Sequence, residues 1–172
     1  MSVKPVNSPV SPFEWLARTI YQPSQMKGSK LLKDCMWPRF KKQSKDFSGF
    51  HEFRISMQRL CHGHRSDCLK IAMSFQQPTQ TLMGFKIGRG LIPIENGFRI
   101  EADGHQNNPF HAHIVVEKLK VPFDPSCIGV VEVMSSGVRR QLDNMTEDFI
   151  FVSIEDFVNN RLPVQSDCAS CL

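Results

Sequence analysis

The stretch HEFRISMQRL, residues 51–60, decides the fold class of this chain. Within it Phe53, Ile55 and Met57 alternate with polar residues, a pattern typical of a β-strand with one buried face. Similar patterns predict further strands at residues 69–75, 83–87, 91–94, 98–102, 110–121, 128–134 and 149–153. We therefore expect a mainly β (α+β) fold with a compact antiparallel, sandwich-like core of about seven strands.

Capping residues predict one short helix at each end of the chain. The N-terminal helix, over residues 12–21, is indicated by a capping box with proline at the first helical position: Ser11, Pro12 and Glu14. At the other end, Ser153 is followed three residues later by Asp156, and the predicted helix ends near Leu162 because Pro163 follows.

Shifts in composition divide the chain into three parts. Residues 1–50 are interpreted as a flexible proline-bearing tail, the short helix and a basic arm. Residues 51–164 are expected to form the β-rich core, and residues 165–172 a loose C-terminal tail. A chain of 172 residues with 41% hydrophobic residues has the size and composition of one globular domain.

Charge is distributed unevenly along the chain. The net charge is +4, but residues 1–70 carry 13 Lys and Arg against 5 Asp and Glu, a net charge of +8. Residues 71–172 carry 8 against 12, a net charge of −4. This asymmetry predicts an anion-seeking end and favours self-association between unlike surfaces, so we expect a homo-oligomer.

The sequence shows no targeting signal of the usual kinds, which predicts an intracellular protein. The N-terminus lacks the apolar core of a signal peptide, and no apolar run approaches the roughly 20 residues that span a bilayer. Ser2 excludes N-myristoylation, and Ala169 excludes prenylation by the usual rule. We therefore expect an intracellular protein that is not secreted, with six reduced cysteines.

A basic stretch between residues 27 and 45 is the strongest functional indication. Clustered cations bind phosphate backbones and anionic headgroups, and interleaved aromatic residues can stack on bases or enter a headgroup layer. The alternative is a solvated surface segment whose aromatic residues anchor it to the core. The candidate binding residues are Lys27, Lys30, Lys33, Trp37, Arg39, Phe40, Lys41, Lys42 and Lys45.

Two groups of residues suggest metal binding. A zinc site needs four sulfur or nitrogen ligands, which Cys61, His62, His64 and Cys68 could supply. Their spacing fits no familiar zinc pattern, so the favoured interpretation is a turn between strands. His111 and His113 share one face of a predicted strand, where they could hold a metal, titrate together or simply be polar. We expect no cofactor.

Catalytic motifs are missing from the sequence. It contains no Gly-Xaa-Ser-Xaa-Gly elbow, no phosphate-binding glycine loop and no His-Glu-Xaa-Xaa-His. The glycine-rich segment 84–90 has the wrong spacing for a dinucleotide fingerprint and is better explained as turns. We therefore expect a protein that is not an enzyme and has no small-molecule substrate.

In layout the chain resembles the matrix proteins of plant-infecting rhabdoviruses. The likeness rests on the proline-bearing segment 8–13, the basic run 27–45 and the strand 51–60 that opens the core. The chain lacks the Pro-Pro-Xaa-Tyr budding signal of many animal relatives. The resemblance implies a non-enzymatic assembly protein that self-associates, condenses nucleocapsid RNA and contacts an anionic membrane. It also implies a location in the host cytoplasm, at the inner face of a membrane and in the virion.

Two other functional classes remain open. Residues 119–133 are similar to the central strands of the plant-virus cell-to-cell movement proteins, which bind single-stranded nucleic acid, although Met134 stands where that family has aspartate. A zinc-binding interaction domain, such as a silencing suppressor, would use the ligands at residues 61–68. Self-assembly separates the matrix interpretation from the movement protein, and metal content separates both from the third class.

Overall fold

The structure is a computed structural model that describes residues 4–11, 14–43, 49–62, 65–89, 98–116, 121–127 and 136–161. The expected mainly β fold is confirmed. The strands are β1 (Trp15–Gln22), β2 (Met26–Lys27), β3 (Lys30–Leu31), β4 (Arg39–Gln43), β5 (His51–Arg59), β6 (Thr81–Arg89), β7 (Phe98–Ala102), β8 (His111–Val116) and β9 (Ile150–Ser153). The α-helices are α1 (Arg65–Ser74), α2 (Ser136–Thr146) and α3 (Ile154–Val158), with 3-10 turns η1 (Lys33–Met36) and η3 (Pro125–Cys127).

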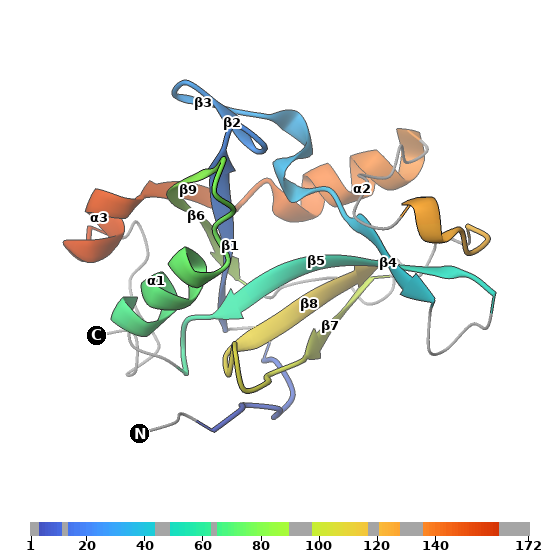
Figure 1. The fold of residues 1–172 in the computed structure, drawn as a ribbon, viewed down its shortest axis with the longest axis horizontal. Helices are drawn as coiled ribbons and strands as arrows, with labels where there is room; N and C mark the ends of the chain where they lie inside the picture. The colour runs from blue at the N-terminus through green and yellow to red at the C-terminus, as the bar shows by residue number, and fades with distance from the viewer. Residues whose placement is uncertain are drawn as a thin grey trace.

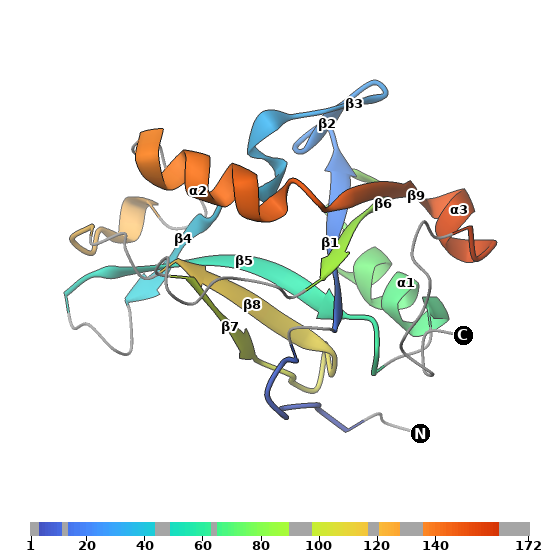
Figure 2. The ribbon, with the colours of Figure 1, turned by 180° about the vertical axis from the view of Figure 1, so that it is seen from behind.

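One antiparallel sheet of seven strands forms the body of the molecule. Six strands follow the order β7-β8-β5-β1-β6-β9, while β4 also pairs with β5. Arg54 of β5 pairs with β4 on one edge and β8 on the other, and Gln58 pairs likewise with β1 and β8. Thus β1 and β4 share one edge of β5. Both β5 and β8 run across the direction of β1 and β6, so the sheet bends where β5 meets β1 (Figures 1 and 2).

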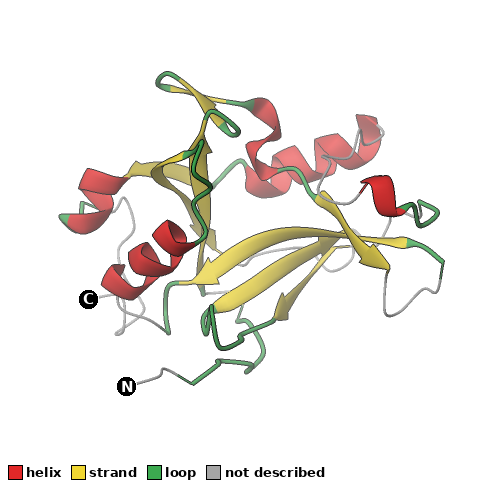
Figure 3. Cartoon of the chain, viewed as in Figure 1, coloured by secondary structure: helices red, strands yellow, loops and turns green. Residues whose placement is uncertain are grey.

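Two clusters of buried side chains form the core. The first contains Leu16 and Ile20 from β1, Ile55 from β5, Ile114 from β8 and Leu142 from α2. The second joins the sheet at β1 and β6 to the helices α1 and α3, which lie on that side of the molecule (Figure 3). It contains Ala17, Cys68, Ala72, Phe85, Ile87 and Phe157. Since successive residues of β1 enter different clusters, this strand is buried on both faces.

The expected N-terminal helix is wrong, because residues 15–22 form β1. One contact of the predicted capping box forms: the Ser11 amide donates to the Glu14 carboxylate at 3.3 Å. The Glu14 amide donates to the Ser11 carbonyl at 3.0 Å, which closes a turn. The chain then extends, because pairing with both β5 and β6 satisfies its backbone. Strands β1 and β4 thus belong to the sheet, so residues 1–50 are not a separate arm.

The helix α1 stands where a strand was expected at residues 69–75. The buried positions of α1 are Cys68 and Ala72, one helical turn apart, whereas Met73 is exposed. The second helix, α2, was not predicted; it buries Leu142 and Thr146 at the same spacing. The C-terminal helix and its cap are confirmed, since the Ser153 hydroxyl accepts from the Asp156 amide at 3.1 Å, but the helix α3 ends at Val158 rather than near Leu162.

Several predictions concern residues beyond the described ranges. These are the strands at 91–94 and 128–134 and the tail at 165–172. Among the helices that the structure describes, none is long and apolar enough to cross a membrane.

The N-terminal segment, residues 4–11, lies against the loop between β7 and β8. The Val6 amide donates to the Pro109 carbonyl at 2.8 Å. A Cβ at Gly104 would lie 2.5 Å from the Pro109 carbonyl oxygen and 2.7 Å from the Val6 nitrogen, so only glycine permits this approach. The guanidinium of Arg59 donates to the carbonyls of Val6 at 3.2 Å and Ser8 at 2.8 Å, which ties the segment to the end of β5.

Candidate nucleic-acid interface

The β2–β3 hairpin presents two lysines in an unfavourable pairing. Lys27 and Lys30 are direct partners in its register, and both are exposed. Gly28 makes the turn with a φ of +59°, a conformation that glycine adopts without strain. The hairpin projects beyond the end of β1 (Figure 1). Like charges placed directly opposite each other are destabilising, and no ion pair with a described residue offsets them. An anion between the two ammonium groups would relieve this repulsion.

The other basic candidates follow this hairpin in the sequence and belong to other elements. Lys33 is the first residue of η1, and Arg39, Lys41 and Lys42 belong to β4. Lys45 lies outside the described residues. Within the described sheet β4 pairs only with β5, so it is an edge strand. Lysines on an edge strand also oppose unwanted pairing between sheets, which gives this part of the stretch a structural role as well.

The aromatic candidates fit a base-stacking role poorly. Trp37 is half-buried and packs against the first core cluster. The guanidinium of Arg139, from α2, lies 4.8 Å from the centre of the Trp37 ring, a cation–π contact that no local sequence pattern predicts. A base could stack on that face only by displacing Arg139. Phe40 pairs with Phe53 in the register of β4 and β5.

The cysteine–histidine candidates are not gathered into a metal site. Cys61 is disulfide-bonded, so the expectation of six reduced cysteines is wrong, whereas Cys35 and Cys68 are outside any disulfide. Cys68 is buried in the second core cluster. His62 lies 3.0 Å from Arg59 and 3.3 Å from Glu14, and His64 lies outside the described ranges. These positions do not support zinc binding by this set.

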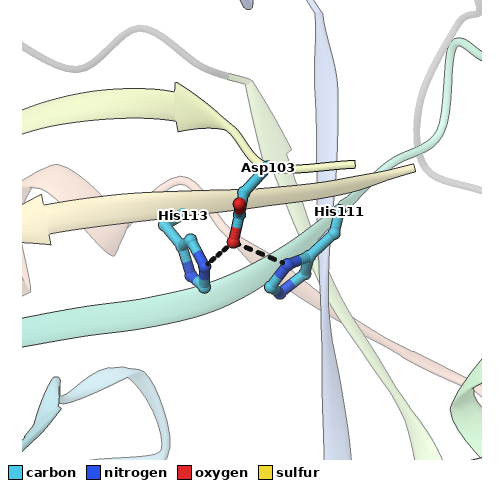
Figure 4. A group of neighbouring side chains, drawn as sticks. All are labelled: Asp103, His111 and His113. Atoms are coloured by element: carbon cyan, nitrogen blue, oxygen red, sulfur yellow. Dashed lines mark hydrogen bonds and ion pairs between the residues drawn. The ribbon is translucent and has the colours of Figure 1, made fainter. Parts of the chain in front are cut away.

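A histidine cluster lies on one face of the β7–β8 hairpin. His111 and His113 share one face of β8, as predicted, and Asp103 follows β7 (Figure 4). The Asp103 carboxylate lies 2.7 Å from Nε2 of His113 and 3.6 Å from Nδ1 of His111. Sequence reasoning found the histidines but missed Asp103, which it treated only as a turn residue. The Asp-Xaa-His spacing of Asp103 and His105, ahead of the histidine pair, was the available signal.

Burial and neighbouring charges set the protonation of this cluster. Burial lowers the pKa of His113 to about 3, and the positive charges of His111 and Arg54 act in the same direction. His113 is therefore neutral at pH 7 and donates its Nε2 proton to Asp103. Burial alone would raise the pKa of Asp103, but the hydrogen bond from His113 and the nearby cationic groups hold it below its usual value.

Acid should destabilise the protein through His113. Between about pH 6.5 and pH 3 the unfolded chain protonates this imidazole but the folded chain does not. Its contribution to stability is therefore complete above about pH 6.5 and is lost as the pH falls toward 3. We expect a loss of about 2–3 kcal/mol between pH 7 and pH 4 from this group. Urea unfolding of the wild type and His113→Gln at both pH values checks this; equal pH dependence in the two proteins would contradict it.

Comparison of the chain with protein-family models, curated proteins and solved structures finds no significant match.

Proposed function

We propose that this chain is a non-enzymatic assembly protein of matrix type, which binds phosphate-bearing polymers through the basic stretch 27–45. The observation that carries the proposal is the exposed Lys27–Lys30 pair, which has no carboxylate partner among the described residues. Phosphates spaced along a nucleic acid supply the missing counter-charge, and binding gains free energy when condensed counterions are released. The preferred partner is nucleocapsid RNA, with an anionic membrane as the competing surface.

Self-association is the second part of the proposed function. The N-terminal 70 residues carry a net charge of +8 and the remainder −4, so copies can attract one another through unlike surfaces. In the described sheet β7 and β9 are terminal strands, and Ile150 on β9 is 48% exposed. The attraction between unlike charges favours assembly that strengthens as the salt concentration falls.

The hairpin lysines should contribute directly to RNA binding. For the double variant Lys27→Gln/Lys30→Gln we expect weaker binding to a 30-nucleotide single-stranded RNA of any sequence. The plot of log K against log salt should flatten by about 1.4, since each phosphate contact on a single strand contributes roughly 0.7. Fluorescence anisotropy across a salt series measures both quantities.

A matched variant separates local contacts from net charge. Lys4 and Lys70 are exposed, and Lys4→Gln/Lys70→Gln removes the same charge from other places. An equal effect in the two double variants, or no effect in either, would remove the hairpin from the proposal. Vesicles containing phosphatidylserine provide the membrane arm: loss of vesicle binding with unchanged RNA binding would assign the hairpin to lipid instead.

Assembly should respond to salt in the absence of ligand. We expect sedimentation of the purified chain to show large, salt-reversible species at low ionic strength and smaller ones at high ionic strength. A monomer at every salt concentration would contradict the matrix interpretation. Cooperative coating of single strands by such a monomer would favour the movement-protein class.

A further inference from the structure

We propose that Asp103, His111 and His113 (Figure 4) bind one divalent transition metal ion of the zinc class, and that His105 turns toward the ion as the fourth ligand. This site is separate from the basic hairpin and does not depend on the function proposed above. It is the group with metal-ligand character among the described residues.

The distances between the ligand atoms of the cluster are close to those found around a bound zinc ion. In a tetrahedral zinc site, bond lengths of 2.0–2.2 Å place the ligand atoms about 3.3 Å apart. Here the Asp103 oxygen lies 2.7 Å and 3.6 Å from nitrogens of His113 and His111, and all three ligand atoms lie within 4.8 Å of one another. No pair needs to shift by more than about 1.5 Å to meet the tetrahedral distance.

The type of donor selects the class of metal. Two imidazole nitrogens with one carboxylate oxygen suit zinc, cobalt or nickel. Calcium and magnesium prefer sites made of oxygen ligands, so they fit this set poorly. The proposed ion is therefore a borderline transition metal rather than an alkaline-earth cation.

The strands hold the three ligands firmly. In the sheet register His113 lies between Glu101 of β7 and Ser56 of β5, so its backbone is paired on both sides. The Asp103 amide donates to the His111 carbonyl at 2.9 Å, which fixes the carboxylate next to the histidines. A site built on paired strands is more precise than one built on loops alone.

Neighbouring charges are balanced around the site. Arg54 lies 3.7 Å from Asp103 and would oppose a cation, but it also lies 3.3 Å from Glu101. Glu101 in turn pairs with Arg99 at 2.6 Å. When a metal takes Asp103, Arg54 retains Glu101 as its counter-ion.

His105 lies on the same hairpin, outside the group of three whose ligand atoms are within 4.8 Å of one another, and its exposed ring would have to turn toward the ion to supply a fourth ligand. It is exposed, and its ring centre lies 5.4 Å from that of His111, which is 4.2 Å from that of His113. The four residues follow the spacing Asp-Xaa-His, five intervening residues, His-Xaa-His. Four protein ligands make a closed site, which is typical of a structural metal rather than a catalytic one. The ion would then fix the loop between β7 and β8.

Cobalt provides a spectroscopic test on the full chain after treatment with EDTA. We expect one Co²⁺ per chain, visible absorption bands of tetrahedral type, competition by Zn²⁺ and a higher Tm with Zn²⁺. Asp103→Asn and His111→Gln should each weaken binding by at least about 100-fold, and His105→Gln by about 10-fold with an altered spectrum.

The controls make each outcome decisive. His62→Gln removes an exposed histidine elsewhere and should leave both affinity and spectrum unchanged. Circular dichroism of each metal-free variant verifies that it folds; Asp103, half-exposed, is the ligand safest to replace. The proposal is overturned if the wild type binds neither Co²⁺ nor Zn²⁺, or if Asp103→Asn in a folded chain binds them as tightly as the wild type.

Discussion

Replacing Arg59 with methionine is expected to lower the free energy of unfolding by about 3–5 kcal/mol. Arg59 is 0% exposed at the end of β5, and its guanidinium forms a bidentate pair with Glu14 at 2.6 and 3.0 Å. Glu14 is itself 5% exposed. Removal of the arginine leaves a buried carboxylate without its counter-charge, and the N-terminal segment loses the donors that bind its carbonyls.

A double-mutant cycle isolates the ion pair from the rest of the Arg59 contacts. Urea unfolding of Arg59→Met, Glu14→Gln and the double variant gives the coupling energy between the two side chains. We expect the double variant to be less destabilised than the sum of the single ones, because it leaves no buried charge unpaired. A loss below about 1 kcal/mol for Arg59→Met would show that Glu14 reaches water or another partner when the arginine is absent.

The second large effect is expected at α3. Phe157 is 0% exposed, and its ring centre lies 4.3 Å from that of Phe85 on β6. It is the buried residue of a helix that spans only Ile154–Val158, so packing rather than helix length must hold this element in place. Phe157→Ala should therefore lower the free energy of unfolding by about 3–5 kcal/mol, the range for truncating a buried phenylalanine.

The adjacent residue is a natural control for this prediction. Val158 is 57% exposed, so Val158→Ala should change the free energy of unfolding by less than about 0.5 kcal/mol. Thermal and urea unfolding of both variants gives the comparison. Similar small changes in both would mean that α3 contributes little to the cooperative unit.

Local sequence predicted the strands that have one polar face. β7 and β9 lie where alternation placed them, and β8 occupies the first part of its predicted range. The prediction failed at β1, because the local contact between Ser11 and Glu14 resembles the start of a helix, whereas strand pairing on both edges makes the chain extend. It also failed at α1, whose buried face consists of the small residues Cys68 and Ala72.

The candidate sites show the same limit. The basic stretch and the histidine pair were visible as local patterns. Asp103 lies ten residues from His113 and meets it only through the hairpin register, which a linear pattern does not contain. Likewise Lys27 and Lys30 lie directly opposite each other because a two-residue turn joins β2 to β3. The contact between Arg139 and Trp37 joins α2 to a segment that is distant in the sequence.

The place of β1 in the sheet has a consequence for the timing of synthesis. β1 is the first strand made, yet its partners are β5 and β6, which begin at residues 51 and 81. At 5–20 residues per second, about 3–12 s pass between completion of Gln22 and the appearance of Thr81. Both edges of β1, a strand that the fold buries on both faces, are open to other chains until β5 appears, and one edge stays open until β6 appears. Newly made copies of this protein are therefore most vulnerable to aggregation before β6 leaves the ribosome.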